Sequence, residues 1–461
     1  MTDTDERTPG RKLFTALIVA VLLVVPLFTV YLLVYDRQTQ SETARSSIAE
    51  GWGGPQTIAG PVLVIPYPEQ VDETVTEAGK QIVKSTTVWR ELTLSPDLVD
   101  LRSDLTPQRR QRSIYETVVY EAQTAGRARF VLPVDLPRFG VTRERLAFDR
   151  AELRFGLRDA RGLFGPPPRV TIGGRRLVLQ PGKGPSETGG SGFFLWLDAA
   201  SLTEGPLSVD FAYSFRGNGW LSLMPQAGDT RWTVASKWPN PSFQGGFAPV
   251  TRKVSNDGFT ATYRVGNLAL GRALVTGGAA APDAKPELAS RDVATLGEPA
   301  GAFEARVDLM IRIDLYDQVN RSVKYGFLFI GFTFIAFLMF DVIVGVRVAA
   351  VEYLLVGAGL VLFFVLLLAF AEVIGFTPAY LLASAAIVAL LAGYSAAVLR
   401  SRQRGGVIAA LLTGLYGVLY VLLSLEAYSL LIGSVLLFVA LAGIMYLTRN
   451  LDWSGLKRAE S

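Results

Sequence analysis

The sequence has 461 residues, of which 50% are hydrophobic and 19% are charged, and its mean hydropathy is +0.32. Soluble globular proteins carry about 25% charged residues, so this composition predicts segments that cross a membrane. The absence of cysteine and histidine excludes disulfides, zinc sites built on these residues, and catalysis by a thiolate or an imidazole. The net charge of +4 leaves little excess once arginines at helix ends are discounted, and we expect no nucleic-acid partner.

The first predicted element is a membrane helix near the N-terminus. Leu13–Val34 is an uncharged run of about 22 residues, which is long enough to cross a hydrocarbon core of roughly 30 Å. A cleaved signal peptide would have an apolar region of about 7–15 residues, followed by a small-x-small cleavage site. Tyr35-Asp36-Arg37-Gln38 follows instead. This favours an uncleaved anchor over residues 13–34, preceded by a cytoplasmic segment, residues 1–12.

Further apolar runs within residues 324–448 predict a C-terminal bundle of five membrane helices. Lys and Arg in the short connections decide its orientation, because positive residues concentrate on the cytoplasmic side. Nearly all of them fall on one side if both termini are cytoplasmic, which makes residues 449–461 a cytoplasmic tail and places residues 35–323 outside the cytoplasm. The predicted helices are Phe327–Val346, Tyr353–Ile374, Ala379–Leu399, Val407–Leu425 and Tyr428–Leu447.

Residues 35–323 are predicted to form a mainly β domain. Apolar and polar residues alternate in Phe303–Tyr316 and in Leu207–Arg216, which is the period of a half-buried strand. We therefore expect antiparallel sheets in a sandwich-like arrangement with one or two cores. Pro181–Gly192 and Thr276–Gly301 are rich in Gly, Ala and Pro and are predicted as flexible surface loops. Shorter strand candidates are Val62–Tyr67, Val83–Leu94, Ser113–Leu132, Val170–Leu179, Trp232–Ser236 and Phe259–Val265.

One loop of this domain is a candidate ligand-binding segment. Between Trp238 and Phe247 the aromatic residues stand among prolines and glycines, as a rigid binding loop would require. The alternative is a crossover between sheets that packs its rings into the core. The candidate outer-domain loop residues are Trp238, Pro239 and Phe243.

Two clusters of arginine have simple explanations. Arg400-Ser401-Arg402-Gln403-Arg404 would contact acidic lipid or nucleic acid, but a short basic connection between membrane helices is what orientation alone requires. Arg109-Arg110-Gln111-Arg112 would bind anionic envelope polymers, but its alternative is a solvated strand edge protected by charge.

Carboxylates near the membrane define a candidate functional rim. Asp341 and Glu352 fall toward the cytoplasmic ends of the predicted helices and Glu372 and Glu426 toward the outer ends, so none lies at mid-bilayer, where transporters usually place coupling groups. Two positive residues before the second helix break the positive-inside pattern. We predict that they pair with Glu372 and Glu426, the alternative being contact with lipid headgroups. The rim comprises Arg321, Lys324, Tyr325, Glu372 and Glu426.

Several sequence motifs resemble those of the CreD family of bacterial inner-membrane proteins. In the β domain these are Ala59–Tyr67, Asp159-Ala160-Arg161-Gly162, Ser236–Gly245 and Asp257-Gly258-Phe259. In the C-terminal part they are Arg321–Ile330, Glu352–Gly357, Leu415-Tyr416-Gly417, Leu425–Tyr428 and Met445–Trp453. The resemblance implies a periplasmic location for the β domain and a role in cell envelope integrity, linked to an envelope or carbon-source stress response, with no established catalytic activity.

The predicted function is therefore non-enzymatic, with no catalytic residue, metal or cofactor. The expected partners are the phospholipid bilayer and a periplasmic or cell-wall component that the β domain engages. Two alternatives stay open: a transporter or channel for an envelope metabolite or lipid, and a hydrolase that uses carboxylates alone. A polar cavity through the bundle would favour the first, and a close carboxylate pair in a cleft of the β domain the second.

Overall fold

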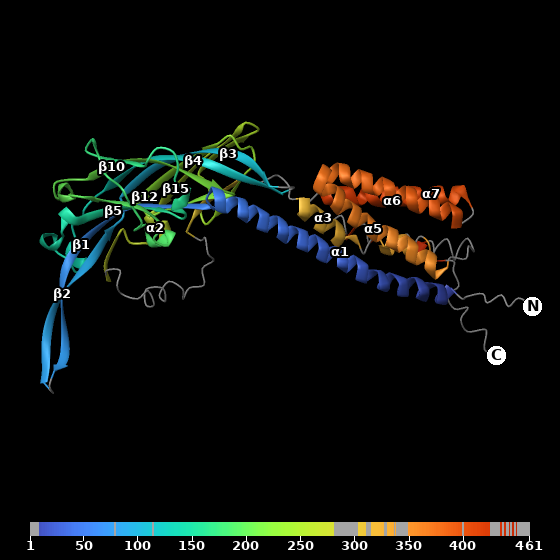
Figure 1. Cartoon of the computed structure of the whole chain (residues 1–461), viewed down its shortest axis with the longest axis horizontal. Helices are drawn as coiled ribbons and strands as arrows, with labels where there is room; N and C mark the ends of the chain where they lie inside the picture. The colour runs from blue at the N-terminus through green and yellow to red at the C-terminus, as the bar shows by residue number, and fades with distance from the viewer. Residues whose placement is uncertain are drawn as a thin grey trace, which may run out of the picture. The chain divides into compact units, whose positions relative to one another are not determined.

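A computed structural model describes residues 9–77, 80–112, 115–280, 303–309, 315–326, 330–335, 337, 349–398 and 401–424, with isolated positions between 434 and 449. The chain divides into two compact units (Figure 1). The helical unit contains Met1–Thr43 and Ile313–Ser461, and the β unit contains Ala44–Arg312. The sequence placed these boundaries after residues 34 and 323.

Four described helices are long and apolar enough to cross a membrane. They are α1 (Pro9–Trp52), α5 (Ala350–Ile374), α6 (Phe376–Val398) and α7 (Arg402–Ser424). These confirm the predicted N-terminal span and three of the five C-terminal ones. Within the predicted span Phe327–Val346, only 330–335 and 337 are described, as helix, and most of Tyr428–Leu447 lies outside the described residues.

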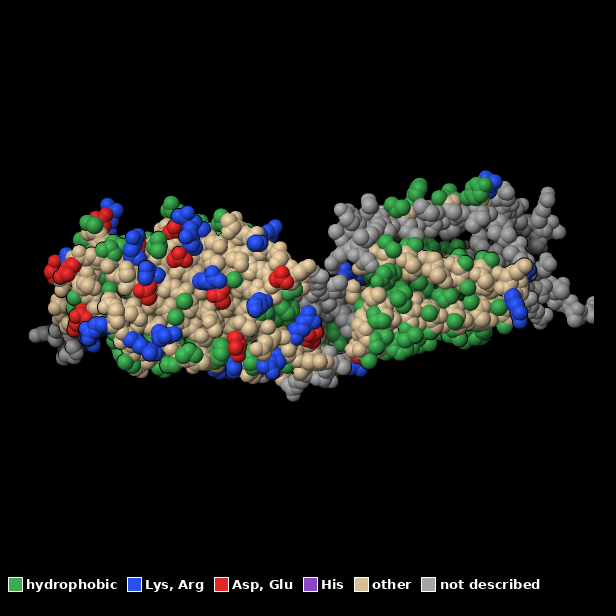
Figure 2. Space-filling model, turned by 90° about the horizontal axis from the view of Figure 1, so that it is seen from above, with side chains coloured by type: hydrophobic (Ala, Val, Ile, Leu, Met, Phe, Trp, Pro, Cys, Tyr) green, Lys and Arg blue, Asp and Glu red, His purple; other side chains and the backbone are tan. Residues whose placement is uncertain are grey.

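The helical unit is held together by apolar and aromatic packing. Helix α5 contacts α6, and α6 contacts α7. The rings of Phe363 and Tyr416 lie 4.6 Å apart, and the Tyr380 hydroxyl donates to the Tyr416 carbonyl at 2.7 Å. Gly357 lets α1 approach α5, because a Cβ there would lie 1.9 Å from a methyl of Leu23. The face of this unit seen in Figure 2 is largely apolar, as a lipid-facing surface requires.

Helix α1 is longer than the sequence predicted. It continues past Val34 through a polar stretch of mainly Ser, Thr, Gln, Glu, Arg and Ala and ends at Trp52, just before Gly53-Gly54-Pro55. Proline and glycine end it, whereas the polar residues before them are compatible with a helix. The strand predicted over Phe303–Tyr316 is shorter than expected: β17 covers Ala305–Leu309, and the amphipathic helix α3 begins at Leu315 and ends at Lys324.

The β unit is a sandwich of two sheets. The first follows the order β13 (Pro241–Gly245), β17, β11 (Trp220–Met224), β1 (Gln56–Glu77), β5 (Ala151–Leu157), β9 (Gly192–Leu197) and β8 (Gln180–Pro181), with β2 (Lys80–Leu94) on β1 and β16 (Val275–Ala280) on β2. The second follows β14 (Thr251–Ser255), β15 (Gly258–Gly266), β12 (Asp229–Ser236), β3 (Leu98–Arg112), β4 (Tyr115–Phe130), β10 (Leu207–Asn218), β6 (Arg169–Ile172) and β7 (Arg175–Arg176).

The strand directions correct the sequence prediction of antiparallel sheets. Strand β1 pairs with β11 in parallel, and β12 pairs with β3 in parallel, so both sheets are mixed. Parallel neighbours need a crossover connection rather than a tight turn, and hydrophobic alternation within one strand does not reveal such a connection. Short elements join the strands: α2 (Asn267–Leu270) and 3₁₀ turns at Leu136–Phe139, Arg143–Arg145, Phe148–Arg150, Ala160–Gly162, Ser186–Thr188 and Ala200–Thr203.

A single hydrophobic core joins the two sheets. Buried side chains of both sheets belong to one contiguous cluster, which decides between the one or two cores that the sequence allowed. Phe155 of β5 contacts Phe211 of β10 edge to face, with ring centroids 5.4 Å apart. The buried Tyr120 of β4 donates its hydroxyl to the Trp220 carbonyl of β11 at 2.7 Å. These contacts between the sheets fix how one sheet packs on the other and therefore where the strand ends lie.

The predicted flexible loop Pro181–Gly192 is instead anchored. Thr188 is buried, and its hydroxyl donates to the carbonyls of Pro185 and Ser191 at 3.0 and 2.7 Å. Lys183 contacts the carboxylate of Glu152. Glycine content alone did not reveal these contacts. The second predicted loop, Thr276–Gly301, begins inside β16, and its remaining residues, 281–301, lie outside the described residues.

Candidate groove on the second sheet and candidate rim of the helical unit

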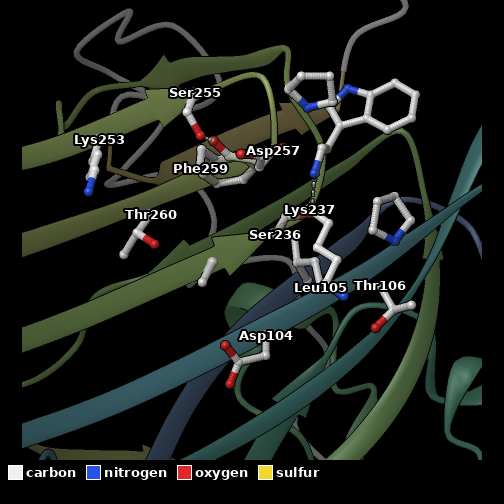
Figure 3. A pocket seen from close by; sticks show the side chains of 15 residues that line it. Asp104, Leu105, Thr106, Ser236, Lys237, Lys253, Ser255, Asp257, Phe259 and Thr260 are labelled. Carbon is white, nitrogen blue, oxygen red and sulfur yellow. Dashed lines mark hydrogen bonds between the residues drawn. The ribbon is translucent and has the colours of Figure 1, made fainter.

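The candidate outer-domain loop lines a groove at one end of the second sheet. Trp238 and Pro239 follow β12 directly and contribute to a cavity of about 760 Å³ (Figure 3). Phe243 is not among the residues that line the groove: it lies on β13 at the edge of the first sheet, where its ring meets Phe259 of β15 edge to face at 5.9 Å. Trp238 is buried and belongs to the hydrophobic core, as the crossover interpretation predicts, and it also lines the groove. The lining residues are Asp104–Pro107, Ala235–Pro239, Lys253, Ser255 and Asp257–Thr260.

The groove is hollow because its two central strands carry small residues. Ala235 of β12 pairs with Thr260 of β15, and Gly258 begins β15 beside the end of β12. Gly258 has φ +140°, and a Cβ there would lie 2.1 Å from the Ser236 carbonyl oxygen and 2.7 Å from the Lys237 Cα. Only glycine therefore fits at this position. The glycine of the motif Asp257-Gly258-Phe259 thus allows β15 to approach the end of β12 closely.

Charged residues stand on both sides of this hollow. Strand pairing aligns Lys253, Thr260, Ala235 and Asp104 in one row across β14, β15, β12 and β3. Three strand spacings of about 4.8 Å put the backbones of Lys253 and Asp104 about 14 Å apart. In this row the positive charge of Lys253 lies on β14 and the negative charge of Asp104 on β3. Nearer the turn between β14 and β15 the arrangement is reversed, because the negative Asp257 lies in that turn and the positive Lys237 follows β12. The groove thus carries two positive and two negative side chains, all exposed.

Most of these charges have no ion pair within the described part of the chain. The side chains of Lys237, Lys253 and Asp257 take part in no hydrogen bond or salt bridge there, whereas Asp104 accepts three hydrogen bonds from the Arg102 guanidinium. That bidentate contact raises the pKa of Arg102, first through the hydrogen bonds and then through the opposite charge. An unpaired, solvated charge keeps its capacity to bind an oppositely charged group.

The remaining groove atoms provide hydrogen bonds and an apolar floor. The Ser236 hydroxyl accepts from the Trp238 amide at 3.2 Å, and the Ser255 hydroxyl donates to the Gly258 carbonyl at 3.2 Å. The guanidinium of Arg109 lies 5.4 Å from the Trp238 ring centroid. Arg109 belongs to the predicted basic run, and this part of β3 extends beyond the end of β12, so it is indeed a strand edge. The combination suits a polar ligand that carries both signs of charge.

Another motif of the β unit is structural. In Asp159-Ala160-Arg161-Gly162, the Asp159 side chain accepts from the amide and guanidinium of Arg161. The Gln56 side chain amide donates to the carbonyls of Asp159 and Arg216 at 3.1 and 3.0 Å. The hydrogen bonds from Arg161 outweigh partial burial and lower the pKa of Asp159. These polar groups satisfy one another, so the motif holds β1 and β10 in place.

In the helical unit, Glu372 of the rim is held by two other helices. Its carboxylate accepts from the Tyr316 hydroxyl of α3 at 3.1 Å, and the Arg37 guanidinium of α1 lies 3.9 Å away. The sequence predicted Arg321 as the partner. Arg321 donates its Nε to the Asp317 carbonyl of its own helix at 3.3 Å. Arg37 and Tyr316 were missed because the first was assigned to the region beyond the membrane helix and the second to a strand.

The other rim residues are only partly described. Lys324 is exposed at the end of α3, Tyr325 is half-buried beside it, and Glu426 lies outside the described residues. Among the residues that the structure places, no three carboxylates come together in a way that would hold a metal ion. Sequence reasoning also missed the groove residues Lys237, Lys253, Asp257 and Asp104. Lys237 and Asp257 stood inside recognised motifs, but only the pairing of β12 with β15 shows that those motifs meet.

Comparison with known proteins gives a family for the chain. The family model described as inner membrane protein CreD matches residues 9–454. The chain is also 31% identical over 436 residues to the inner membrane protein CreD of Escherichia coli (strain K12), an alignment that covers 94% of this chain and 91% of that protein. The chain belongs to the CreD family of inner membrane proteins. The groove and the described rim both lie within the residues that the family model matches.

Proposed function

We propose that this CreD-family protein maintains the cell envelope by binding the peptide part of the cell wall with its β unit, without catalysis. One observation carries the proposal. Two motifs that resemble the CreD family, Ser236-Lys237-Trp238-Pro239 and Asp257-Gly258-Phe259, lie at the ends of two paired strands and line one groove. The sign pattern of that groove fits a ligand that carries both amines and carboxylates.

The size of the groove supports a short peptide. The row from Lys253 to Asp104 spans about 14 Å, which is about four extended residues at roughly 3.4 Å each. A carboxylate of such a peptide would lie against Lys253 or Lys237, and its amine against Asp104 or Asp257. The hydroxyl groups of Thr106 and of other lining residues would hydrogen-bond to the peptide groups between the two charged ends of the ligand. Cell-wall peptides carry both charges, whereas a polyanion would meet no net positive charge from these four side chains.

The distribution of positive residues supports a location of the β unit outside the cytoplasm, as this role requires. The chain has no native cysteine, so a single cysteine reports topology cleanly. We expect Val134→Cys, at a side chain that is 97% exposed on the β unit, to react with a membrane-impermeant thiol reagent in spheroplasts. Ser461→Cys should react only after the membrane is permeabilised. The reverse pattern would contradict the proposal.

Photo-crosslinking in cells tests the binding role. A photoreactive amino acid replaces Thr260, in the middle of the groove row, and in a control chain it replaces Arg175 at the opposite edge of the same sheet. After irradiation, the full chain is purified, digested with cell-wall hydrolases and analysed by mass spectrometry. We expect adducts that contain cell-wall peptide at position 260 only. Equal labelling at both positions, or adducts of phospholipid alone, would overturn the proposal.

The carboxylate-hydrolase alternative is not favoured by the charges of the β unit. Glu91 and Glu152 both bind Arg154 within a cleft. A carboxyl that acts as general acid must hold its proton near neutral pH, which requires a raised pKa. Burial of Glu152 opposes its ionisation, but Lys183 and Arg154 outweigh burial and lower its pKa. The pair therefore supports a binding role better than an acid–base role.

A further inference from the structure

The outer face of the first sheet carries two exposed tryptophans around a second pocket. Trp89 of β2 is 41% exposed and Trp196 of β9 is 56% exposed. They line a cavity of about 330 Å³ together with Glu91, Glu152 and Asp149. Large rings are usually buried, and their exposure beside polar groups is a common feature of ligand sites. This pocket lies on the other sheet from the groove of Figure 3.

Strand pairing explains how the pocket is built. Trp196 pairs with Glu152 of β5, and Glu152 pairs with Val64 of β1. Two residues further along β1, and therefore on the same face, Pro66 pairs with Glu91 of β2. The carboxylates therefore lie between the two tryptophans on one face of the sheet. Small or flat side chains, Val64 and Pro66, form the floor between them. The two tryptophan rings therefore border the pocket and do not fill it.

The charges of the pocket are balanced. The Arg154 guanidinium donates to Glu91 at 2.7 Å and to Glu152 at 2.7 Å, and Lys183 contacts the other oxygen of Glu152. Arg150 lies over the Trp89 ring at 4.7 Å. With Asp149, three carboxylates face three cations in and beside the pocket. Such a site has little net attraction for a charged ligand, but its carboxylates keep lone pairs that accept further hydrogen bonds.

We propose that this pocket binds a neutral saccharide segment. A sugar ring has an apolar C–H face that packs on an aromatic ring and hydroxyls that hydrogen-bond to carboxylates and guanidinium groups. Trp196, the more exposed ring, provides the stacking surface. Glu91, Glu152 and Arg150 are placed to bind the hydroxyls. The inference goes beyond the peptide-binding role and does not depend on it.

Titration of the full chain in detergent with the tetrasaccharide of N-acetylglucosamine, followed by calorimetry and tryptophan fluorescence, tests the proposal. We expect Trp196→Ala to weaken binding about tenfold or more and Trp196→Phe to retain most of the affinity, because a ring is kept. The matched control is Leu268→Ala, at an exposed apolar side chain, which should bind as the wild type does.

The outcomes separate this proposal from the peptide-binding one. The groove variant Lys253→Ala with Asp104→Ala should bind the tetrasaccharide normally, even if it has lost the peptide. Absence of measurable binding of the tetrasaccharide to the wild-type chain would overturn the proposal. An equal affinity of Trp196→Ala and Leu268→Ala would also overturn it. Since Trp196 is exposed, its truncation is expected to leave the melting temperature unchanged, and circular dichroism confirms that each variant is folded.

Discussion

The two candidate sites of the β unit arrange their charges differently. Around the tryptophan pocket of the first sheet, Glu91, Glu152 and Arg154 are partly buried and bonded to one another. In the groove of the second sheet, Lys253 and Asp104 are exposed and stand on opposite sides of a hollow. Paired charges inside a cleft depend on one another, because removing one leaves the other desolvated without a partner, whereas separated charges leave binding capacity for a ligand. The same residue types therefore serve different purposes on the two faces.

The largest expected effect is on the paired face. Arg154→Ala leaves two partly buried carboxylates without their shared cation, and we expect it to destabilise the protein by about 2–3 kcal/mol. Thermal unfolding of the full chain in detergent, followed by circular dichroism, measures this. The control is Arg127→Ala, which removes the exposed pair with Asp210 and should leave the melting temperature unchanged. Equal effects of both variants would erase the distinction between the two faces.

A backbone change on the groove face comes next. Gly258→Ala places a methyl group against the Ser236 carbonyl, and we expect a loss of about 1–3 kcal/mol from strain. Gly173→Ala is the control, since Gly173 also has a positive φ but faces open space. The difference between the two melting temperatures reports the clash together with the more extreme backbone angle at Gly258, where φ is +140° rather than +56°. If Gly173→Ala is as harmful as Gly258→Ala, close approach of the strands is not the reason for the motif.

The pH dependence of stability sharpens the comparison further. The pKa of Glu152 is lowered in the folded protein, so the unfolded chain binds a proton more readily. Its contribution is therefore fully present above the unfolded pKa of about 4.3 and is lost as the pH falls through the lower folded value. We expect wild-type stability to fall more steeply than that of Glu152→Gln between about pH 5 and pH 3. Parallel curves in a melting series would show that the network carries no such linkage.

The smallest effect is expected for the carboxylate of the helical unit. Glu372 contacts Arg37 and Tyr316, so a double-mutant cycle of Arg37→Ala and Glu372→Ala should give a coupling of about 0.5–1 kcal/mol. The cycle of Arg321→Ala with Glu372→Ala tests the pair that the sequence predicted, and we expect it to be additive. Coupling in the second cycle alone would restore the original pairing and displace Arg37.

Much of this architecture was predictable because hydrophobic runs and alternation are local signals. The spans Tyr353–Ile374 and Val407–Leu425 match α5 and α7 closely, and the alternation in Leu207–Arg216 matches β10. The parallel pairing of β12 with β3 was not predictable, because a parallel neighbour is set by a crossover far away in the sequence. Helix α1 was ended too early because its continuation is polar, and a polar sequence signals the end of a membrane span rather than of a helix.

The candidate sites show the same division. Trp238 and Pro239 were identified from local composition and do line the groove. Lys253 and Asp104 were not identified, because they converge only through the pairing of four strands. Likewise, nothing in the sequence connects Trp89 with Trp196, which meet around one pocket through the order β2, β1, β5 and β9. Sites that depend on sheet order cannot be assembled from motifs alone.

The most direct test of the account is the affinity of the groove for a cell-wall peptide. The full chain in detergent is titrated calorimetrically with a synthetic tetrapeptide that carries a free side-chain amine and two carboxylates. We predict measurable binding that weakens at least about tenfold, or about 1.4 kcal/mol, in Lys253→Ala with Asp104→Ala. It should remain unchanged in Arg175→Ala with Arg176→Ala, at the opposite edge of the same sheet. No binding by the wild type, or the same affinity in both double variants, would contradict a peptide-binding groove.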